Sequence, residues 1–320
     1  MPLMKKKGFY PEEIIFAVTD KCNLRCSHCY VKRNDIDLDL NKAEKFLLSC
    51  KDSPVNMVGF SGGEPFLNLD LITSLVKTAI NCDMMFDRII TNGVWWKNET
   101  ELNEKLTNLY DAGFDGKIGL SWDSFHGQSL SKMLTFIKTV YKIWNQKDIL
   151  DIQSVISSDN SKNIEDLDNF DSLADELSCN TTVLLSKKTG RGTILLENDD
   201  IYLPIYRELQ SFPASDKRTW TSRKWFKDDF CEGPGQVLFV HPNGNIAPCC
   251  GFANENNQLI IGTIEDDFQK VMQNASENEM VNLCYEKGLS KEIKKLKKIV
   301  PGKTIDICAF CDFVCKNHKS

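Results

Sequence analysis

Three cysteines near the beginning of the chain, Cys22, Cys26 and Cys29, have the spacing C-x3-C-x2-C. Three thiolates this close together can hold three irons of a cubane cluster, which ordinarily takes four cysteines. The fourth iron would then be open to bind another molecule. The same spacing also fits half of a zinc site, or small apolar residues that are simply buried. The spacing by itself leaves these alternatives open.

The chain has 13 cysteines among 320 residues, and nothing in its first residues indicates secretion. Under reducing conditions such cysteines are metal ligands or catalytic thiols more often than disulfides. A second group lies toward the end of the chain: Cys231, Cys249, Cys250, Cys308, Cys311 and Cys315. The remaining cysteines lie in apolar or helical surroundings and are interpreted as structural: Cys50, Cys82, Cys179 and Cys284.

The overall composition excludes several classes of protein. The net charge of -6 argues against a nucleic-acid partner, because phosphate binding requires a basic surface. The first ten residues contain lysines but no apolar core, so they are not a signal peptide. No stretch approaches the roughly 18 apolar residues of a membrane span. We therefore expect a cytoplasmic protein without membrane contact, long enough for two domains.

Short runs rich in Val, Ile and Leu alternate with helical patterns through the first part of the chain. The runs are residues 14–18, 56–60, 87–90, 117–120, 149–155 and 182–185, and helical spacing marks residues 69–81, 129–144 and 164–177. Strands that alternate with helices predict an α/β fold. We expect a parallel sheet that right-handed crossovers curl into a partial (β/α)6 TIM barrel.

Polar and glycine-rich segments follow these strands. The three cysteines follow the first strand, and the later segments are residues 61–65, 91–93, 121–126 and 186–192. Because the carboxyl ends of parallel strands meet at one edge of a sheet, these segments should converge on one pocket. That placement is independent of the cysteine spacing, and it favours the cluster with an open iron.

The cysteine spacing and these loops, over residues 10–195, resemble the radical S-adenosylmethionine (SAM) superfamily. In that family the open iron of a [4Fe-4S] cluster binds the amino and carboxylate groups of SAM. The reduced cluster then splits SAM into methionine and a 5′-deoxyadenosyl radical. The resemblance implies that residues 1–195 form such a domain and that an electron donor such as flavodoxin or ferredoxin is a partner.

The resemblance also implies contacts to SAM. In the family, the loop that here contains Gly62 and Gly63 hydrogen-bonds the methionine amino group, and Glu64 supports this loop. A strand-to-helix turn without a ligand is the simpler alternative for the same segment. A His or aromatic residue beside the third cysteine is typical of the family near the adenine, which assigns His28 and Tyr30 to cofactor binding.

Later strand ends supply the remaining candidates of the SAM site. The resemblance places Asn92 near the ribose or carboxylate, Ser121 and Asp123 near the ribose, and Arg191 near the SAM carboxylate. The Asn-Gly pair at the first of these is also an ordinary turn signal, and Asp123 could instead cap the following helix. His126 has no clear role in the family and is a candidate group on the substrate side.

The composition changes in the last third of the chain. We expect a connector at residues 196–225 and a small α+β domain at residues 226–320. An Asn-Gly pair at residues 243–244, between two β-like runs, predicts a hairpin. Such a hairpin brings Cys231 and Cys249 to the same end of the domain.

A metal-binding knuckle, with cysteines at 308, 311 and 315, lies near the C-terminus. Two cysteines from the hairpin and two from this knuckle make four ligands for an auxiliary [4Fe-4S] cluster. The candidates in the knuckle are Cys308, Cys311 and Cys315, of which Cys315 could be a spare ligand. Zinc is the alternative for the same thiols. Neighbouring residues of an extended chain point to opposite sides, so Cys249 and Cys250 are not both expected to be ligands.

The pattern C-x12-G-x4-C, from Cys231 through Gly244 to Cys249, resembles the SPASM/twitch domains appended to many radical SAM enzymes. The later cysteines of the full pattern are missing, which implies the twitch form with one auxiliary cluster. The adjacent Cys250 resembles twitch-type peptide epimerases, in which a radical removes a Cα hydrogen and a cysteine returns one. The alternative is that Cys250 only fills a buried space.

These observations lead to three functional hypotheses. The first is a radical SAM epimerase of a ribosomally synthesised peptide, with Cys250 as hydrogen donor. The second is oxidation of a peptide or small molecule through the auxiliary cluster, as in a dehydrogenase or a thioether-forming enzyme. The third is a non-catalytic iron–sulfur electron carrier or zinc-binding protein. Because the first strand starts near residue 13, we expect a peptide's leader to bind the barrel or the connector directly.

Overall fold

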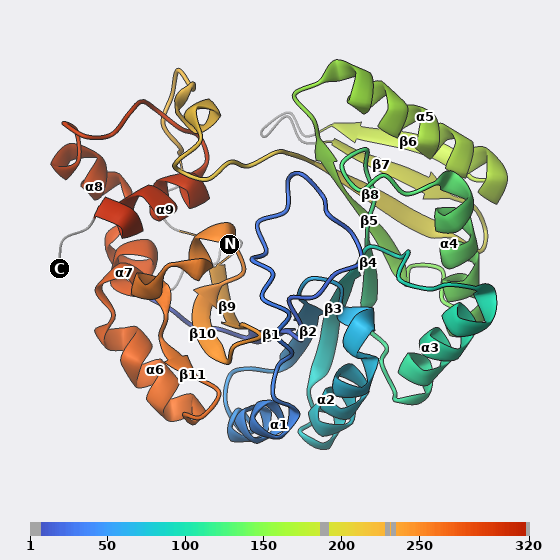
Figure 1. The fold of residues 1–320 in the computed structure, drawn as a ribbon, viewed down its shortest axis with the longest axis horizontal. Helices are drawn as coiled ribbons and strands as arrows, with labels where there is room; N and C mark the ends of the chain where they lie inside the picture. Colours follow the sequence, from blue (N-terminus) through green and yellow to red (C-terminus); the bar gives the residue numbers. More distant parts are fainter. Residues whose placement is uncertain (1–7, 186–191, 228–230, 232–234, 318–320) are drawn as a thin grey trace, which may run out of the picture. The chain divides into compact units, whose positions relative to one another are not determined.

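The computed structural model of the protein describes residues 8–185, 192–227, 231 and 235–317 (Figure 1). These residues form two compact units. The barrel unit is made of Ala17–Leu40 and Val58–Gln210. The cysteine-rich unit is made of the described residues in Met1–Phe16, Asn41–Met57 and Ser211–Ser320.

The barrel unit is built on strands in the order β2-β3-β4-β5-β8-β7-β6. Their bounds are Met57–Ser61 (β2), Met85–Thr91 (β3), Lys117–Ser121 (β4), Leu150–Ile156 (β5), Asn180–Leu185 (β6), Gly192–Glu197 (β7) and Tyr202–Leu209 (β8). From β3 through β4 and β5 to β8, neighbouring strands pair in parallel. Most of the apolar side chains in the middle of these strands are buried, among them Ile89, Ile118, Leu120, Ile152 and Ile205.

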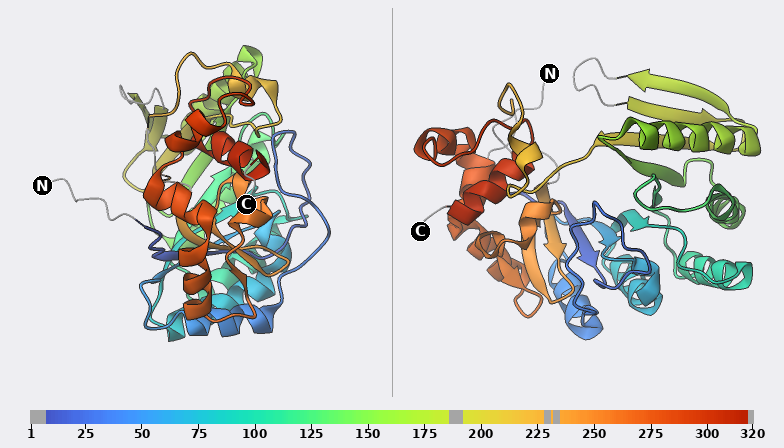
Figure 2. Two further views of the ribbon diagram at one scale, coloured as in Figure 1. Left: turned by 90° about the vertical axis from the view of Figure 1, so that its left-hand side faces the viewer. Right: turned by 45° about the horizontal axis from the view of Figure 1, so that its top comes forward.

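Helices lie along the outer face of this sheet (Figures 1 and 2). They are α2 (Leu69–Asn81), α3 (Glu99–Asp111), α4 (Leu130–Trp144) and α5 (Asn160–Leu177). Each turns an apolar stripe toward the strands, because its buried residues recur at helical spacing. The predicted α/β fold with a barrel-like parallel sheet is therefore confirmed.

The end of the barrel sheet differs from the prediction. Residues 182–185 were expected to be the sixth parallel strand, but β6 is antiparallel to β7, which is antiparallel to β8. It is β8 that pairs in parallel with β5, with Ile152 opposite Ile205. That prediction was wrong because a Val- and Leu-rich run predicts a strand but neither its direction nor its burial, and Val183 and Leu184 are in fact exposed.

Strand β8 also occupies residues that were expected to be a connector. Its sequence contains Pro204 and Arg207, which interrupt the apolar pattern and hid the strand. The segment expected as a connector over residues 196–225 therefore contains a strand. The boundary expected at residue 195 lies inside β7, and the domain limits themselves stay a prediction.

The cysteine-rich unit contains strands in the order β11-β10-β9-β1. Their bounds are Glu13–Ala17 (β1), Gly235–Val240 (β9), Asn245–Cys249 (β10) and Gly262–Thr263 (β11). β9 and β10 form the predicted antiparallel hairpin, with Val240 opposite Ile246. Gly244 has a φ of +86° at the turn, which explains the Asn-Gly signal.

Helices make up the rest of this unit (Figure 2). They are α1 (Leu40–Ser49), α6 (Phe268–Glu277), α7 (Glu279–Asn282), α8 (Ser290–Lys295) and α9 (Ile307–Asn317), with a π-helical turn at Leu283–Lys287. Within the described ranges, none of the helices combines the length and the apolar character that a membrane crossing needs.

Candidate functional site

The three N-terminal cysteines lie on an irregular loop of the barrel unit. Cys22 and Cys26 are half-buried and Cys29 is exposed. The loop is held by its own backbone, since the Cys29 N–H donates to the Cys26 carbonyl at 3.2 Å. Arg33 also donates to the carbonyls of Cys22 and Leu24. Three accessible thiols on one short, supported loop fit a cluster that they bind through three irons.

The predicted glycine loop after β2 packs against the chain that enters the cysteine loop. A Cβ on Gly62 would lie 2.4 Å from the Thr19 carbonyl oxygen, and a Cβ on Gly63 would lie 2.2 Å from that of Lys21. The Gly63 N–H donates to the Thr19 carbonyl at 2.7 Å. The missing side chains therefore allow a close approach of two backbones. Their contact to SAM stays a prediction.

Glu64 joins the ends of two neighbouring strands. Its fully buried carboxylate accepts hydrogen bonds from the Thr91 hydroxyl at 2.7 Å, the Asn92 N–H at 2.8 Å and the Phe66 N–H at 3.2 Å. This geometry agrees with the supporting role expected for Glu64. Burial raises the pKa of this carboxyl to about 7, although the three hydrogen bonds oppose the shift.

Asn92 contacts the cysteine loop and forms the turn that the Asn-Gly pair predicts, and its contact to SAM stays a prediction. Its side-chain amide donates to the Asn23 side-chain oxygen at 2.9 Å and lies 3.7 Å from the Cys22 sulfur. Its side-chain oxygen accepts from the Val94 N–H at 2.9 Å, which builds the turn at Gly93. The strand end after β3 therefore contacts the cysteine loop directly.

Gln128 links the ends of β3 and β4, and the sequence analysis did not predict it. Its side-chain N–H donates to the carbonyls of Asn92, at 2.8 Å, and Ser121, at 2.7 Å. Ser121 is half-buried at the end of β4. No motif in the sequence marks Gln128 as part of the site. It lies in the loop before α4, and its side chain extends back to the ends of β3 and β4.

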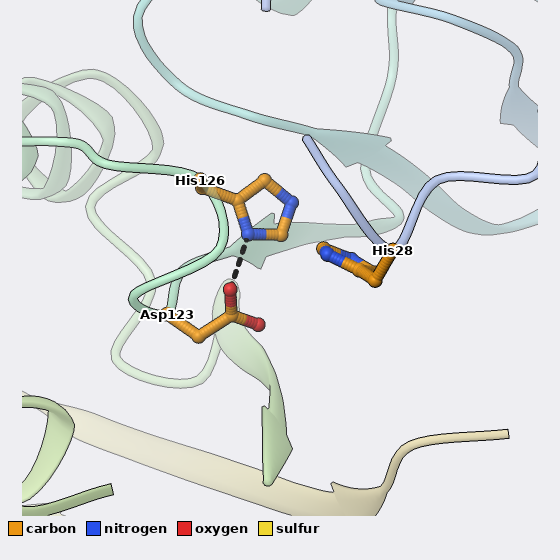
Figure 3. A group of neighbouring side chains, drawn as sticks. All are labelled: His28, Asp123 and His126. Carbon is orange, nitrogen blue, oxygen red and sulfur yellow. Dashed lines mark hydrogen bonds and ion pairs between the residues drawn. The ribbon is translucent and has the colours of Figure 1, made fainter. Parts of the chain in front are cut away.

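Asp123, His126 and His28 lie close together (Figure 3). One side-chain nitrogen or oxygen atom of each residue lies within 4.8 Å of those of the other two. One Asp123 oxygen accepts from His126 Nδ1 at 2.7 Å, and the other accepts from the Val155 N–H at 2.8 Å. The rings of His28 and His126 pack edge to face, with their centroids 4.9 Å apart. The Asp123 carboxylate is therefore engaged by protein groups, and its ribose contact stays a prediction.

The alternative that Asp123 caps a helix was wrong, because the cap of α4 is Ser129. Burial alone would lower the pKa of His126, but the hydrogen bonds and charges of Asp123 and Cys26 raise it to about 10. Burial would raise the pKa of Asp123, and His126 brings it below its ordinary value. The pair is therefore ionised at neutral pH and lies against the cysteine loop. A substrate role of His126 stays a prediction.

One predicted SAM contact, Tyr30, stands apart from this group, and another lies outside the described residues. Tyr30 is exposed beside Cys29. Arg191 lies outside the described residues, so its position is not defined by the structure. The strand that it was expected to follow is β6, which is not the sixth parallel strand.

The cysteine-rich unit brings a second set of thiols together. Cys249 is buried at the end of β10, opposite Gly235. The Cys231 sulfur lies 2.8 Å from where a Cβ on Gly235 would be, so the hairpin does bring Cys231 and Cys249 to the same end. Cys250, the residue after β10, is exposed. That Cys249 and Cys250 are not both ligands stays a prediction.

The knuckle cysteines lie on α9 at helical spacing, which puts them on one face. Cys311 and Cys315 are buried and Cys308 is half-buried. Burial raises the pKa of Cys231 to about 11 and that of Cys308 to about 12, and neighbouring thiols add to both shifts. Thiols with such raised pKa values stay protonated at neutral pH unless a metal binds them as thiolates. This all-sulfur set fits an iron–sulfur cluster, and zinc stays the alternative.

Cys284 belongs to the same set and was missed. Its sulfur lies 3.6 Å from that of Cys311, and both residues are buried. The sequence interpreted Cys284 as structural because it has no motif spacing to the other cysteines. Only the fold brings the π-helical turn against α9.

Comparison with protein families gives two matches along the chain. Residues 16–150 match the radical SAM superfamily, and residues 231–312 match the SPASM iron–sulfur cluster-binding domain. An uncharacterized protein of Methanocaldococcus jannaschii, MJ0907, is 26% identical over 78% of this chain and 91% of its own length.

Two further relatives are similar along nearly the whole chain. The "Putative peptide biosynthesis protein YydG" of Bacillus subtilis is 20% identical over 94% of this chain and 91% of its own. The structure of native anSMEcpe with bound AdoMet and Cp18Cys peptide covers 95% of this chain and 96% of its own, at 15% identity and a TM-score of 0.56. At that identity the likeness concerns the fold alone.

Proposed function

We propose that this chain is a radical SAM enzyme with a C-terminal SPASM domain and that it epimerises a residue of a ribosomally synthesised peptide. The observation that carries the proposal is the exposed Cys250 directly after the buried Cys249. A hydrogen donor must reach its substrate, which the exposed Cys250 can do, whereas the buried Cys249 is assigned to the auxiliary cluster. We therefore assign cluster binding to Cys249, the last residue of β10, and hydrogen donation to the next residue, Cys250.

The loop with Cys22, Cys26 and Cys29 would hold the SAM-binding cluster, which supplies the electron that converts SAM into methionine and the 5′-deoxyadenosyl radical. The chain's own residues position that loop. Glu64 fastens the ends of β2 and β3, and Asn92 contacts the loop itself. We assign the SAM contacts of the sequence analysis to this edge of the barrel unit.

The proposed reaction exchanges one hydrogen at a Cα atom. The adenosyl radical breaks the Cα–H bond and becomes 5′-deoxyadenosine. The Cys250 thiol then gives its hydrogen to the opposite face of the Cα radical, which forms a C–H bond and leaves a thiyl radical on sulfur. One electron and one proton restore the thiol, so each turnover uses two electrons from a donor such as flavodoxin or ferredoxin.

Two of the relatives support a peptide as substrate. One is named for peptide biosynthesis, and the other is a structure that holds a peptide together with AdoMet. Binding of the leader by the barrel or the connector, and a cytoplasmic location, belong to the same proposal.

Oxidation is the second candidate, because the cysteine-rich unit offers a buried all-thiol site for an auxiliary cluster. Such a cluster could accept an electron from a substrate radical, which would give a dehydrogenated or cross-linked product. The two candidates differ in the mass of the product, since epimerisation in ordinary water changes no mass.

The decisive experiment uses a short peptide encoded beside this chain's gene, with SAM and a reductant in deuterated water. Epimerisation predicts one deuterium in the product per turnover. Cys250→Ala should still release 5′-deoxyadenosine and keep its iron, but it should form no epimer. The matched control is Cys179→Ala, a cysteine outside both thiol sets. An unlabelled product lighter by two mass units would show oxidation and refute the epimerase.

A further inference from the structure

We propose that Cys284 is a hydrogen-bond donor to the auxiliary cluster, through the sulfur of Cys311, and that it raises the reduction potential of that cluster. The inference rests on the auxiliary cluster proposed above, with Cys231, Cys249, Cys308 and Cys311 as its ligands. The two sulfurs are 3.6 Å apart, which is within the range of a hydrogen bond between sulfur atoms.

The π-helical turn places Cys284 by fastening it to the hairpin that carries two of the ligands. The Cys231 N–H donates to the Cys284 carbonyl at 3.3 Å. The neighbouring Tyr285 hydroxyl donates to the Pro248 carbonyl at 2.7 Å, one residue before Cys249. Wide turns of this kind are rare and recur at functional sites. The position of Cys284 is therefore tied to the thiol set on two sides.

The distance separates the roles of Cys284 and Cys311. Cysteine sulfurs bound to different irons of one cubane lie well outside its corners, much farther apart than 3.6 Å. In this arrangement the two cysteines are therefore not both ligands of one cluster. The knuckle spacing of Cys308 and Cys311 assigns Cys311 as the ligand, which leaves Cys284 as its neighbour.

The direction of the hydrogen bond follows from this assignment. A Cys311 sulfur bound to iron carries no proton, so the proton between the two sulfurs belongs to Cys284. Hydrogen bonds to cluster sulfurs are one of the features that set the potential of an iron–sulfur cluster. Because they withdraw electron density from the sulfur, they favour the reduced and more negative form.

The test isolates the auxiliary cluster in a parent with alanine at Cys22, Cys26 and Cys29. Into this parent we would introduce Cys284→Ala, Cys284→Ser and, as a control for a buried cysteine elsewhere in the unit, Cys50→Ala. Iron and sulfide per chain and the midpoint potential from an electron paramagnetic resonance titration are measured under anaerobic conditions. Circular dichroism confirms that each variant is folded.

We expect unchanged iron and sulfide in both Cys284 variants. The midpoint should become more negative in Cys284→Ala. It should stay at or above the parent value in Cys284→Ser, because the hydroxyl still donates. Loss of iron in Cys284→Ala would make Cys284 a ligand and overturn the inference, as would an unshifted midpoint in Cys284→Ala or a more negative one in Cys284→Ser. A parent without iron would refute the auxiliary cluster itself.

Discussion

At the scale of single residues, the SAM site depends on groups that shape the cysteine loop. Glycines at 62 and 63 and the buried Glu64 work together, since the glycines allow two backbones to touch and the carboxylate ties the strand ends. Substitutions at these three positions should therefore disturb the loop that carries Cys22, Cys26 and Cys29.

Gly63→Ala tests the close approach. Its Cβ would lie 2.2 Å from the Lys21 carbonyl oxygen, and backbone cannot give way as a flexible side chain would. We expect a loss of about 1–3 kcal/mol of stability and weaker SAM binding, measured by urea unfolding and calorimetry. In the comparison variant Gly127→Ala nothing lies within 4 Å of the new Cβ, so only the φ of +68° opposes the side chain and the loss of stability should be smaller. Equal behaviour of the two variants would contradict the prediction.

Glu64 also predicts a pH dependence. Its pKa of about 7 in the folded protein lies above the ordinary 4.5, so the folded state binds this proton more tightly. The stability contributed by protonated Glu64 is therefore full below pH 4.5 and is lost as pH rises through about 7. The shift corresponds to about 3 kcal/mol.

The measurement for Glu64 is urea unfolding at several pH values. The decrease in unfolding free energy from acid to neutral pH should be smaller in Glu64→Gln than in the parent. Glu104→Gln, which changes an exposed glutamate, should keep the parent's decrease. An identical pH profile for Glu64→Gln and the parent would refute the raised pKa.

At the scale of elements, strand β8 does more than close the sheet. Its Arg207 pairs with Asp166 of α5 at 3.1 Å, and both are buried. The other Asp166 oxygen accepts from the Ser124 N–H at 2.7 Å, beside Asp123. One buried ion pair therefore links a strand, a helix and the loop after β4.

Arg207→Met should leave the Asp166 charge buried without its partner. Breaking such a pair costs about 3–5 kcal/mol, whereas an exposed pair is worth about 1 kcal/mol or less. The comparison is Arg218→Met, whose arginine pairs with Asp216 at 2.6 Å and is 58% exposed. Denaturant unfolding measures both variants. Losses of similar size would show that β8 does not anchor the loop in this way.

At the scale of the whole molecule, the chain carries one thiol set in each compact unit. Two [4Fe-4S] clusters predict about eight irons per chain after anaerobic purification. Alanine at all three N-terminal cysteines should leave about four, and chelation of zinc should change neither value. Iron analysis and absorption spectroscopy check this. A colourless protein rich in zinc would refute both clusters.

Features that depend on short stretches of chain were determined by the sequence itself. The cysteine spacing is part of the sequence, and the hairpin at Gly244 follows from local backbone geometry. Helix α2 has the predicted bounds for the same reason, because its apolar residues recur at helical spacing.

Only the tertiary structure decided the features that join distant residues. Cys284 and Cys311 are 27 positions apart, and Asp166 and Arg207 are 41 apart. The order and direction of β6, β7 and β8 also depend on pairing between segments that are distant in the sequence. Hydrophobic patterns show that a segment is buried, but the partner that buries it is selected by the packing of the complete chain.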